Sequence, residues 1–167
     1  KDKVEVSFRN QFEYQIEQKQ FQYDLSFALD ELAELNIKLE LGSFDLDMFK
    51  NNMESHSAPL ITKSAKDIEI KQVQFEYKDL KLANILFDAY PEIARGYDLL
   101  KLQATLLLLQ YPIQQKSLVT ALNDFQSEKN KLGFSLNAKK VLKISDIPEL
   151  FLSGQMAEYA LIEFYGK

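Results

Sequence analysis

The sequence predicts an α+β fold, in which a curved antiparallel sheet of about five long strands wraps a leucine-rich helix. Apolar and polar residues alternate through most of residues 4–41, which is typical of strands with one buried face. From Asp79 the apolar spacing becomes that of a helix, and residues 99–109 are apolar on nearly every side. The chain has 167 residues, which suits one domain, and we assign that domain to residues 1–167.

The first three strands are expected over residues 4–16, 21–29 and 35–41. Apolar side chains fall on even positions in the first strand, which only Asn10 interrupts, and on odd positions in the other two. The polar stretch 17–20 and the short link 30–34 are suited to tight connections between them. The three strands therefore form an antiparallel meander.

A fourth strand is expected near residues 68–77, and its alternation changes parity midway. Its apolar residues are Ile68, Ile70, Val73, Phe75 and Tyr77. A slip of one residue would turn the second half of this strand to the opposite face of the sheet. We therefore predict a β-bulge at Lys71–Gln72 that keeps all of these side chains on one face.

The helical spacings predict helices over residues 45–53, 79–89, 98–109 and 113–130. Ser43 or Asp45 can cap the first helix, and Asp79 can cap the second. The third helix has so few polar residues that it should be enclosed on several sides. We therefore expect Leu106→Asp or Leu107→Asp to unfold the domain, because burying an unpaired carboxylate costs several kcal/mol.

Gly133 is expected to end the last of these helices in a left-handed conformation. Period two then returns over residues 134–144, which we interpret as the fifth strand. Residues 146–153 match a capping-box spacing and predict a short helix that stops before Gly154. The tail, residues 155–165, fits either a helix or a strand, and we favour the helix.

The composition excludes several classes of protein. Lys and Arg number 20 and Asp and Glu 25, a net charge of −5, so we expect no nucleic-acid partner. Cysteine is absent, which removes disulfides and thiolate metal sites. No apolar run reaches the ~20 residues of a membrane span, and no signal peptide is recognisable. The chain begins with Lys1 rather than Met, which suggests a mature form or a domain excised from a larger protein.

One stretch departs from the acidic average: residues 129–143 carry five lysines and no acidic residue. Such a run is usually a solvated face, and that is the interpretation we favour. The alternative is a patch that attracts an anionic partner, for which charge steering would be the physical basis.

The sequence contains no arrangement that indicates catalysis or metal binding. His56 is the only histidine, and we interpret it as a surface residue of a loop over residues 54–66. One histidine without cysteine cannot form a zinc motif, and the isolated glycines form no phosphate-binding loop. The pair Asp45 and Asp47 is better explained as helix-start acids than as a calcium loop. We therefore expect a protein that is not an enzyme and has no metal or cofactor.

The remaining feature is the aromatic content, eight Tyr and twelve Phe. Most of these residues fall on the apolar positions of the strands, where side chains usually form core. The alternative is an apolar cleft for an acyl chain or a partner helix. The candidate residues for such a cleft are Phe12, Tyr14, Phe27, Phe75, Tyr77 and Leu106.

Three segments carry a resemblance to a known group of proteins. They are FEYKDLKL at residues 75–82, Leu122-x-x-Phe125 with KLGFSL at residues 131–136, and LKISDI at residues 142–147. Together, over residues 67–147, they resemble uncharacterised cell-envelope proteins and surface lipoproteins of Gram-negative bacteria. This chain lacks the prolines expected in the final strand of that pattern. The resemblance implies a periplasmic or outer-membrane-anchored location and carries over no catalytic residue.

Three hypotheses for the function follow. The first is a non-catalytic envelope or surface module that binds a protein or host partner. The second is a carrier for lipid or another apolar ligand, and the third is an enzyme whose carboxylate pair the sequence does not reveal. A filled core with an exposed apolar patch would favour the first, and a cavity against the inner sheet face the second. We expect a filled core without an acyl-chain pocket.

Overall fold

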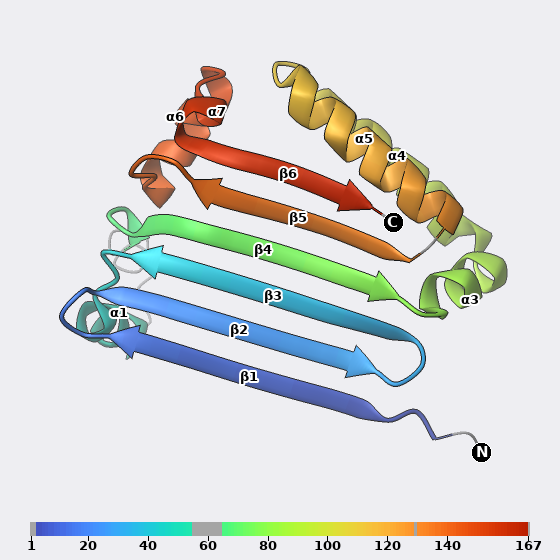
Figure 1. The fold of residues 1–167 in the computed structure, drawn as a ribbon, viewed down its shortest axis with the longest axis horizontal. Coiled ribbons are helices and arrows are strands. Elements are labelled where there is room, and N and C mark those ends of the chain that lie inside the picture. Colours follow the sequence, from blue (N-terminus) through green and yellow to red (C-terminus); the bar gives the residue numbers. More distant parts are fainter. Residues whose placement is uncertain (1–2, 55–64, 129, 167) are drawn as a thin grey trace.

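The computed structural model describes residues 3–54, 65–128 and 130–166, and its fold is α+β (Figure 1). One antiparallel sheet packs against helices, as predicted, but the sheet has six strands instead of about five. The strands lie side by side in the order of the sequence, so every neighbouring pair is antiparallel. They are β1 (Val6–Gln15), β2 (Gln20–Leu29), β3 (Ala33–Gly42), β4 (Glu69–Asp79), β5 (Lys131–Ala138) and β6 (Ala160–Gly166).

In the sequence, the helices lie between consecutive strands of this sheet. They are α1 (Leu46–Glu54), α3 (Leu82–Ala89), α4 (Pro91–Leu107), α5 (Pro112–Glu128), α6 (Ile147–Leu152) and α7 (Met156–Tyr159). In Figure 1 the helices gather at the two ends of the sheet and along β6. No described helix crosses the middle of β1–β4 in that view. The loop predicted over residues 54–66, with His56, lies almost wholly outside the described residues.

The predicted connections between the first three strands are confirmed. β1 and β2 are joined by a turn in which Lys19 has a φ of 48°, and β2 and β3 by one in which Glu31 has a φ of 57°. Asp45 caps α1, because its Oδ1 accepts the backbone N–H of Met48 at 2.9 Å. Local polar residues thus set the turns that fix the strand register.

The β-bulge predicted in the fourth strand is also confirmed. Leu39 pairs with Val73 but Leu41 pairs with Ile70, so β4 has one more residue than β3 between these pairs. The extra residue falls at Lys71, inside the predicted dipeptide. The bulge brings Ile70 and Val73 to the same face in spite of their opposite parity.

The C-terminal third differs from the prediction in three places. Gly133 does not cap a helix: it lies within β5 and is buried where the ring of Tyr165 on β6 packs over it. The fifth strand ends at Ala138, and beyond it only Lys143 forms an isolated bridge, to Glu69. The tail is helical only as far as Tyr159, after which it forms β6 because β5 offers an unpaired edge.

Two clusters of buried side chains form the core at the end of the sheet where α1, α6 and α7 lie (Figure 1). The first contains Tyr111, Leu136, Leu142, Leu150, Met156 and Ala160. The second contains Leu41, Phe44 and Ile68, with Tyr14 and Phe21 packed against it. Other buried side chains, at positions 118, 121, 122 and 125 of α5, lie beside β5 and β6. The core therefore lies at one end of the sheet and under α5, and it does not fill the whole apolar face.

The leucine-rich helix is not enclosed, which corrects the sequence prediction. α4 has no buried residue, and its leucines at positions 99, 100, 102, 106 and 107 are exposed. It packs on α5, where the hydroxyl of Tyr97 donates to the carbonyl of Leu122 at 2.9 Å. The burial on which the expectation for Leu106→Asp or Leu107→Asp rests is therefore absent, because 54% of Leu106 and 68% of Leu107 are exposed.

Helix α5 covers the outer edge of β6. The Ser117 hydroxyl donates to the carbonyl of Phe164 at 2.7 Å and accepts the backbone N–H of the same residue at 3.3 Å. A serine on the helix thereby satisfies two backbone groups that would otherwise form an open sheet edge.

We expect Ser117→Ala to lower the free energy of unfolding by about 1–2 kcal/mol, because it leaves the Phe164 carbonyl and N–H without this partner. Urea unfolding measures the change. The neighbouring substitution Lys116→Ala, at an adjacent position of the same helix, is the matched control and should change stability by less than about 0.5 kcal/mol. Equal effects of the two substitutions would contradict the edge-capping role of Ser117.

Candidate functional site

The strand register assembles one continuous apolar face across the sheet. In an antiparallel sheet, the side chains of paired residues on neighbouring strands point to the same side. They therefore align in rows that run across the strands. One row contains Phe8, Phe27, Leu35, Tyr77 and Leu132. The next contains Asn10, Leu25, Ile37, Phe75, Phe134 and Phe164, and a third contains Phe12, Tyr23, Leu39, Val73, Leu136 and Ile162. Only Asn10 interrupts these rows with a polar side chain.

The part of this face on β1–β4 is open to solvent. Phe8 is 65% exposed and Phe12 70%. Leu39 and Val73, in the third row, pack against the core clusters. The half-buried residues Leu25, Phe27, Leu35, Ile37 and Phe75 belong to neither cluster. We call the following residues the open face: Phe8, Phe12, Leu25, Phe27, Leu35, Ile37 and Phe75.

The open face occupies more than half of the apolar side of β1–β4. Three rows at ~6.6 Å and four strands at ~4.8 Å span roughly 400 Å², and the seven open-face residues cover roughly 220 Å² of it. Monomeric soluble proteins rarely expose contiguous apolar patches larger than a few hundred Å², and larger ones mark binding surfaces. The opposite side of the same strands is polar, with Glu34, Asn36 and Lys38 on β3 alone. The amphipathic strands therefore present one face suited to water and one suited to an apolar partner.

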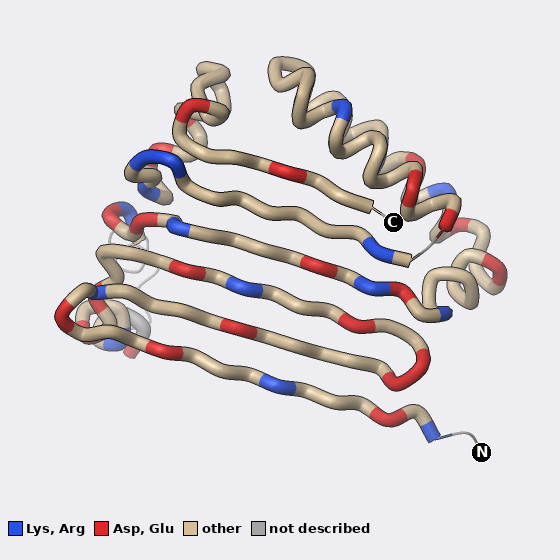
Figure 2. The backbone as a smooth tube through the Cα atoms, in the orientation of Figure 1, with Lys and Arg blue, Asp and Glu red and all other residues tan. Residues whose placement is uncertain are grey.

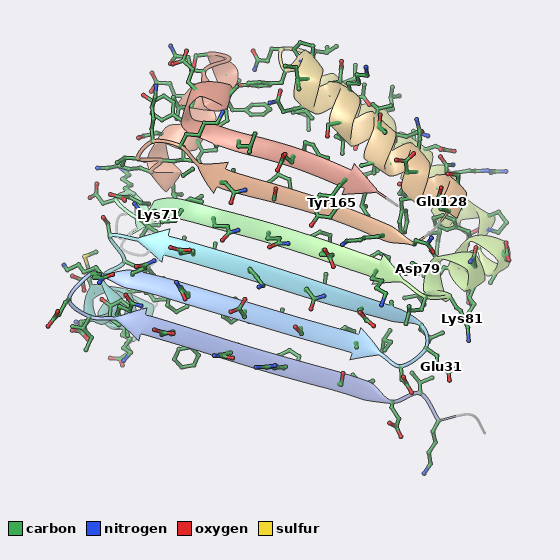
Figure 3. All side chains as sticks on the ribbon, in the orientation of Figure 1. Glu31, Lys71, Asp79, Lys81, Glu128 and Tyr165 are labelled. Atoms are coloured by element: carbon green, nitrogen blue, oxygen red, sulfur yellow. The ribbon has the colours of Figure 1, made fainter. Side chains whose placement is uncertain are left out.

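A buried carboxylate lies at the α3 end of the apolar face, where Figure 3 shows Asp79 at the end of β4. Asp79 is 3% exposed, and its Oδ1 accepts both the Tyr77 hydroxyl and the Ala83 backbone N–H at 2.7 Å. The helix starts at Leu82, with Lys81 and not Asp79 at the N-cap position, but Asp79 still accepts a backbone N–H of its first turn. Burial, together with the bond to Asp79, raises the pKa of Tyr77 well above its usual value, so Tyr77 stays protonated as the donor.

Aromatic rings fix α5 against this end of the sheet. The ring of Phe125 lies 5.8 Å from that of Tyr77 and 6.1 Å from that of Tyr97. Burial and the nearby Asp98 raise the pKa of Tyr97 to about 12, so its hydroxyl also remains a donor at ordinary pH. These contacts bound the open face on the α5 side and leave its β1 side free.

A concave feature, separate from the open face, lies between α5 and β6. It is a groove of about 650 Å³, open to solvent on one side. Its walls combine apolar and polar side chains, among them Ile113, Lys116, Thr120, Asp124 and Phe164. The cleft expected from the sequence includes Leu106 of the leucine-rich helix, but no residue of α4 lines this groove.

Five of the six candidate cleft residues lie on the apolar face of the sheet. Phe12, Phe27 and Phe75 belong to the open face, and Tyr77 lies in the row beginning at Phe8. Tyr14 is on the same face but turns towards the second core cluster, where its hydroxyl donates to the Phe44 carbonyl at 2.9 Å. Leu106, on α4, does not join them.

The candidate cleft residues did not include Phe8, Leu25, Leu35 and Ile37. Their alternation was visible, and it assigned them to the apolar side of the strands. The alternation did not reveal that no other element packs on this side. A period of two shows which side of a strand is apolar, but not what packs against that side.

The lysine-rich stretch is mostly neutralised by acidic residues from other segments. Lys131 pairs with Glu76 at 2.7 Å, Lys143 with Asp67 at 2.9 Å, and Lys140 with Glu158 at 3.5 Å. Figure 2 shows basic residues gathered at the end of β5 that faces α6, next to acidic segments. These pairs favour the solvated face over the anionic-partner patch.

The described part of the chain offers no metal site and no membrane-spanning helix. Within it, no three His, Asp or Glu side chains are grouped as metal ligands would be. Its helices are too short or too polar to cross a bilayer. What the described residues do offer is a broad apolar surface.

Comparison with known proteins adds no relative to this description. No protein-family model matches the chain, and no curated protein matches its sequence.

Proposed function

We propose that the protein is a non-catalytic module that binds a partner protein through the open face of its sheet. The observation that carries this proposal is the row-by-row apolar surface on β1–β4, which the described helices leave uncovered. A flat, open surface of this kind fits a protein element better than it fits a small molecule, which is usually held in a concave pocket.

The energetics of the open face support a binding role. Burying apolar surface contributes about 25 cal/mol per Å², so covering roughly 220 Å² is worth on the order of 5 kcal/mol before the costs of association. Large aromatic side chains such as Phe8, Phe12 and Phe27 are among the residue types that dominate protein interfaces. The face therefore contributes a favourable apolar term to binding.

We place this module in a bacterial cell envelope. The support is the resemblance of residues 67–147 to envelope proteins of Gram-negative bacteria. A host protein or another envelope protein would be the partner under this proposal.

Photocrosslinking tests the proposed function directly. A benzoylphenylalanine at position 27 probes the open face, and the same residue at position 26 probes the polar face of the same strand. We expect a discrete protein adduct in intact bacteria from position 27 and none from position 26. The partner identified by mass spectrometry should then bind the purified protein, and Phe8→Ser with Phe12→Ser should weaken that binding at least about tenfold.

The double substitution is chosen because it leaves folding intact. Phe8 and Phe12 are both more than half exposed, so removing them costs little stability. Circular dichroism and urea unfolding check this. Adducts of equal yield from positions 26 and 27, or an unchanged affinity of the folded double variant, would contradict binding through the open face.

A second candidate function is transport of an acyl chain or another apolar ligand. The groove beside α5 favours it, since about 650 Å³ exceeds the ~300 Å³ that such a ligand needs. Native mass spectrometry of protein purified from bacteria distinguishes the two. A retained lipid that survives desalting, together with a lipid adduct from benzoylphenylalanine at position 113 in the wall of the groove, would replace the partner protein with an apolar ligand.

A further inference from the structure

The two edges of the sheet differ in how they are covered. Ser117 of α5 meets the outer edge of β6, whereas β1 is the last strand on the other side and has no neighbour beyond it among the described residues (Figure 1). The carbonyl of Glu5 accepts the backbone N–H of Asp30 at 2.9 Å, so odd-numbered residues of this segment bond to β2. The even-numbered residues Val6, Phe8, Asn10, Phe12 and Tyr14 therefore direct their N–H and C=O groups outward.

Few of the features that discourage strand pairing are present in β1. Proteins usually protect an edge with proline, charged side chains (above all lysine), a bulge or a short strand, and the two charged residues of β1, Arg9 and Glu13, have opposite signs. β1 is ten residues long, contains neither proline nor lysine, and keeps an unbroken register with β2. Its outer edge is therefore a template for one more antiparallel strand.

We propose that β1 pairs with β1 of a second copy of this chain, antiparallel, about a two-fold axis at Gln11. A partner strand must keep its apolar side chains on the apolar face, because a slip of one residue would invert it. Only registers that set even-numbered residues opposite even-numbered residues meet this condition and use the outward backbone groups. A two-fold axis is the commonest symmetry of homo-oligomers and requires a self-complementary patch.

Charge complementarity selects the register centred on Gln11. In this register Arg9 lies opposite Glu13 of the second copy, and the symmetry creates this pair twice. Shifting the register by one step in either direction places Arg9 opposite a glutamine, Gln11 or Gln15. A further shift sets Arg9 against itself or Glu13 against itself, and like charges directly opposite are destabilising. Arg9 and Glu13 have only hydrogen bonds to nearby glutamines of their own strand, at 3.2 Å, within the described chain.

The same register makes the apolar face continuous across the junction. Phe8 lies opposite Tyr14 of the second copy, and Val6 opposite Ile16, whose side chain is 77% exposed in the single chain. Glu5 faces Glu17 only beyond the ladder, because Glu17 lies in the turn after β1. The dimer would therefore carry one twelve-stranded sheet with two open faces joined side by side.

Charge reversal tests this pairing by sedimentation velocity. We expect the wild-type protein to form dimers, and Arg9→Glu or Glu13→Arg alone to raise the dimer dissociation constant at least about tenfold, since each creates two like-charge pairs. The double variant carrying both substitutions should regain the wild-type dissociation constant. An equimolar mixture of the two single variants should form heterodimers, because each copy then supplies the charge that the other lacks.

Two controls separate edge pairing from other effects. Lys38→Glu makes the same change in net charge as Arg9→Glu on the same polar face but away from the edge, and should leave the dimer unchanged. Asn10→Pro removes one outward N–H without touching the bonds to β2, so it should abolish the dimer while circular dichroism stays native.

Several outcomes would overturn the proposal. One is a wild-type protein that stays monomeric at high concentration, and another is a dimer that tolerates both single reversals. A dimer insensitive to Asn10→Pro but lost with Phe8→Ser and Phe12→Ser would indicate association through the open face instead. The proposal concerns the edge of β1 and does not rest on the proposed function, whose own test uses position 27.

Discussion

Replacing Leu142 with alanine should lower the free energy of unfolding by about 3 kcal/mol, within the range of ~2–5 kcal/mol for fully buried leucines. Leu142 is 0% exposed and lies in the core cluster with Tyr111, Leu150 and Met156. Its backbone is fixed as well, because its carbonyl accepts the N–H of Ile70 at 2.8 Å. The surroundings therefore cannot collapse into the space that the side chain leaves.

The matched control is Leu106→Ala, the same truncation on the exposed helix α4. Because Leu106 is more than half exposed, the loss should stay below about 1 kcal/mol. Urea unfolding of both variants provides the comparison. A larger loss at Leu106 than at Leu142 would mean that the leucine-rich helix is part of the core, as the sequence pattern indicated.

Replacing Asp79 with alanine should cost about 2–4 kcal/mol, because it leaves two buried donors without an acceptor. These donors are the Tyr77 hydroxyl and the Ala83 backbone N–H. Asp79 also joins the last residue of β4 to the first turn of α3, and its own N–H donates to the Asn130 carbonyl at 2.6 Å. Loss of the carboxylate therefore frees the helix from the strand that precedes it.

Tyr77→Phe provides the control for Asp79→Ala, since it removes one of the two donors and keeps the ring. We expect it to cost about 1 kcal/mol, and less in the Asp79→Ala background than in the wild type. Urea unfolding of the four proteins completes the double-mutant cycle. Strictly additive costs would show that the hydroxyl and the carboxylate are not coupled, contrary to the 2.7 Å bond between them.

The strands could be predicted from the sequence because one face of each is apolar and the other polar. The parity change between Ile70 and Val73 even located the bulge, since only an extra residue keeps both on the same face. The cap at Asp45, and the bond of Asp79 to the first turn of α3, could be predicted for a similar reason, because a local side-chain bond determines each of them. These features depend on contacts between residues close in sequence or on strict periodicity.

Features that depend on distant segments could not be predicted. Residues 160–166 form a strand because β5 is available to pair with them, although their apolar spacing also fits a helix. Gly133 is required by the Tyr165 ring across the strands and not by a helix end. In each case a neighbour that is remote in sequence decides the local conformation.

Prediction of the candidate site from the sequence is limited in the same way. The sequence identified Phe12, Phe27 and Phe75 as apolar-face residues, and the favoured interpretation assigned most such residues to the core. An apolar period shows which side of a strand avoids water, but not whether the same chain supplies the cover. The leucines of α4 would have been a plausible cover, and the structure places them away from β1–β4.

Cysteine labelling tests most directly whether the open face is uncovered in solution. The chain has no native cysteine, so single substitutions report one position each. Phe27→Cys samples the open face, Ser26→Cys the polar face of the same strand, and Ala160→Cys, at a residue 1% exposed, the core. We expect alkylation at position 27 to approach the rate at position 26 and to be far faster than at position 160. A rate at position 27 as slow as that at position 160, in a folded protein, would show that the apolar face of β1–β4 is covered and would contradict its role as a binding surface.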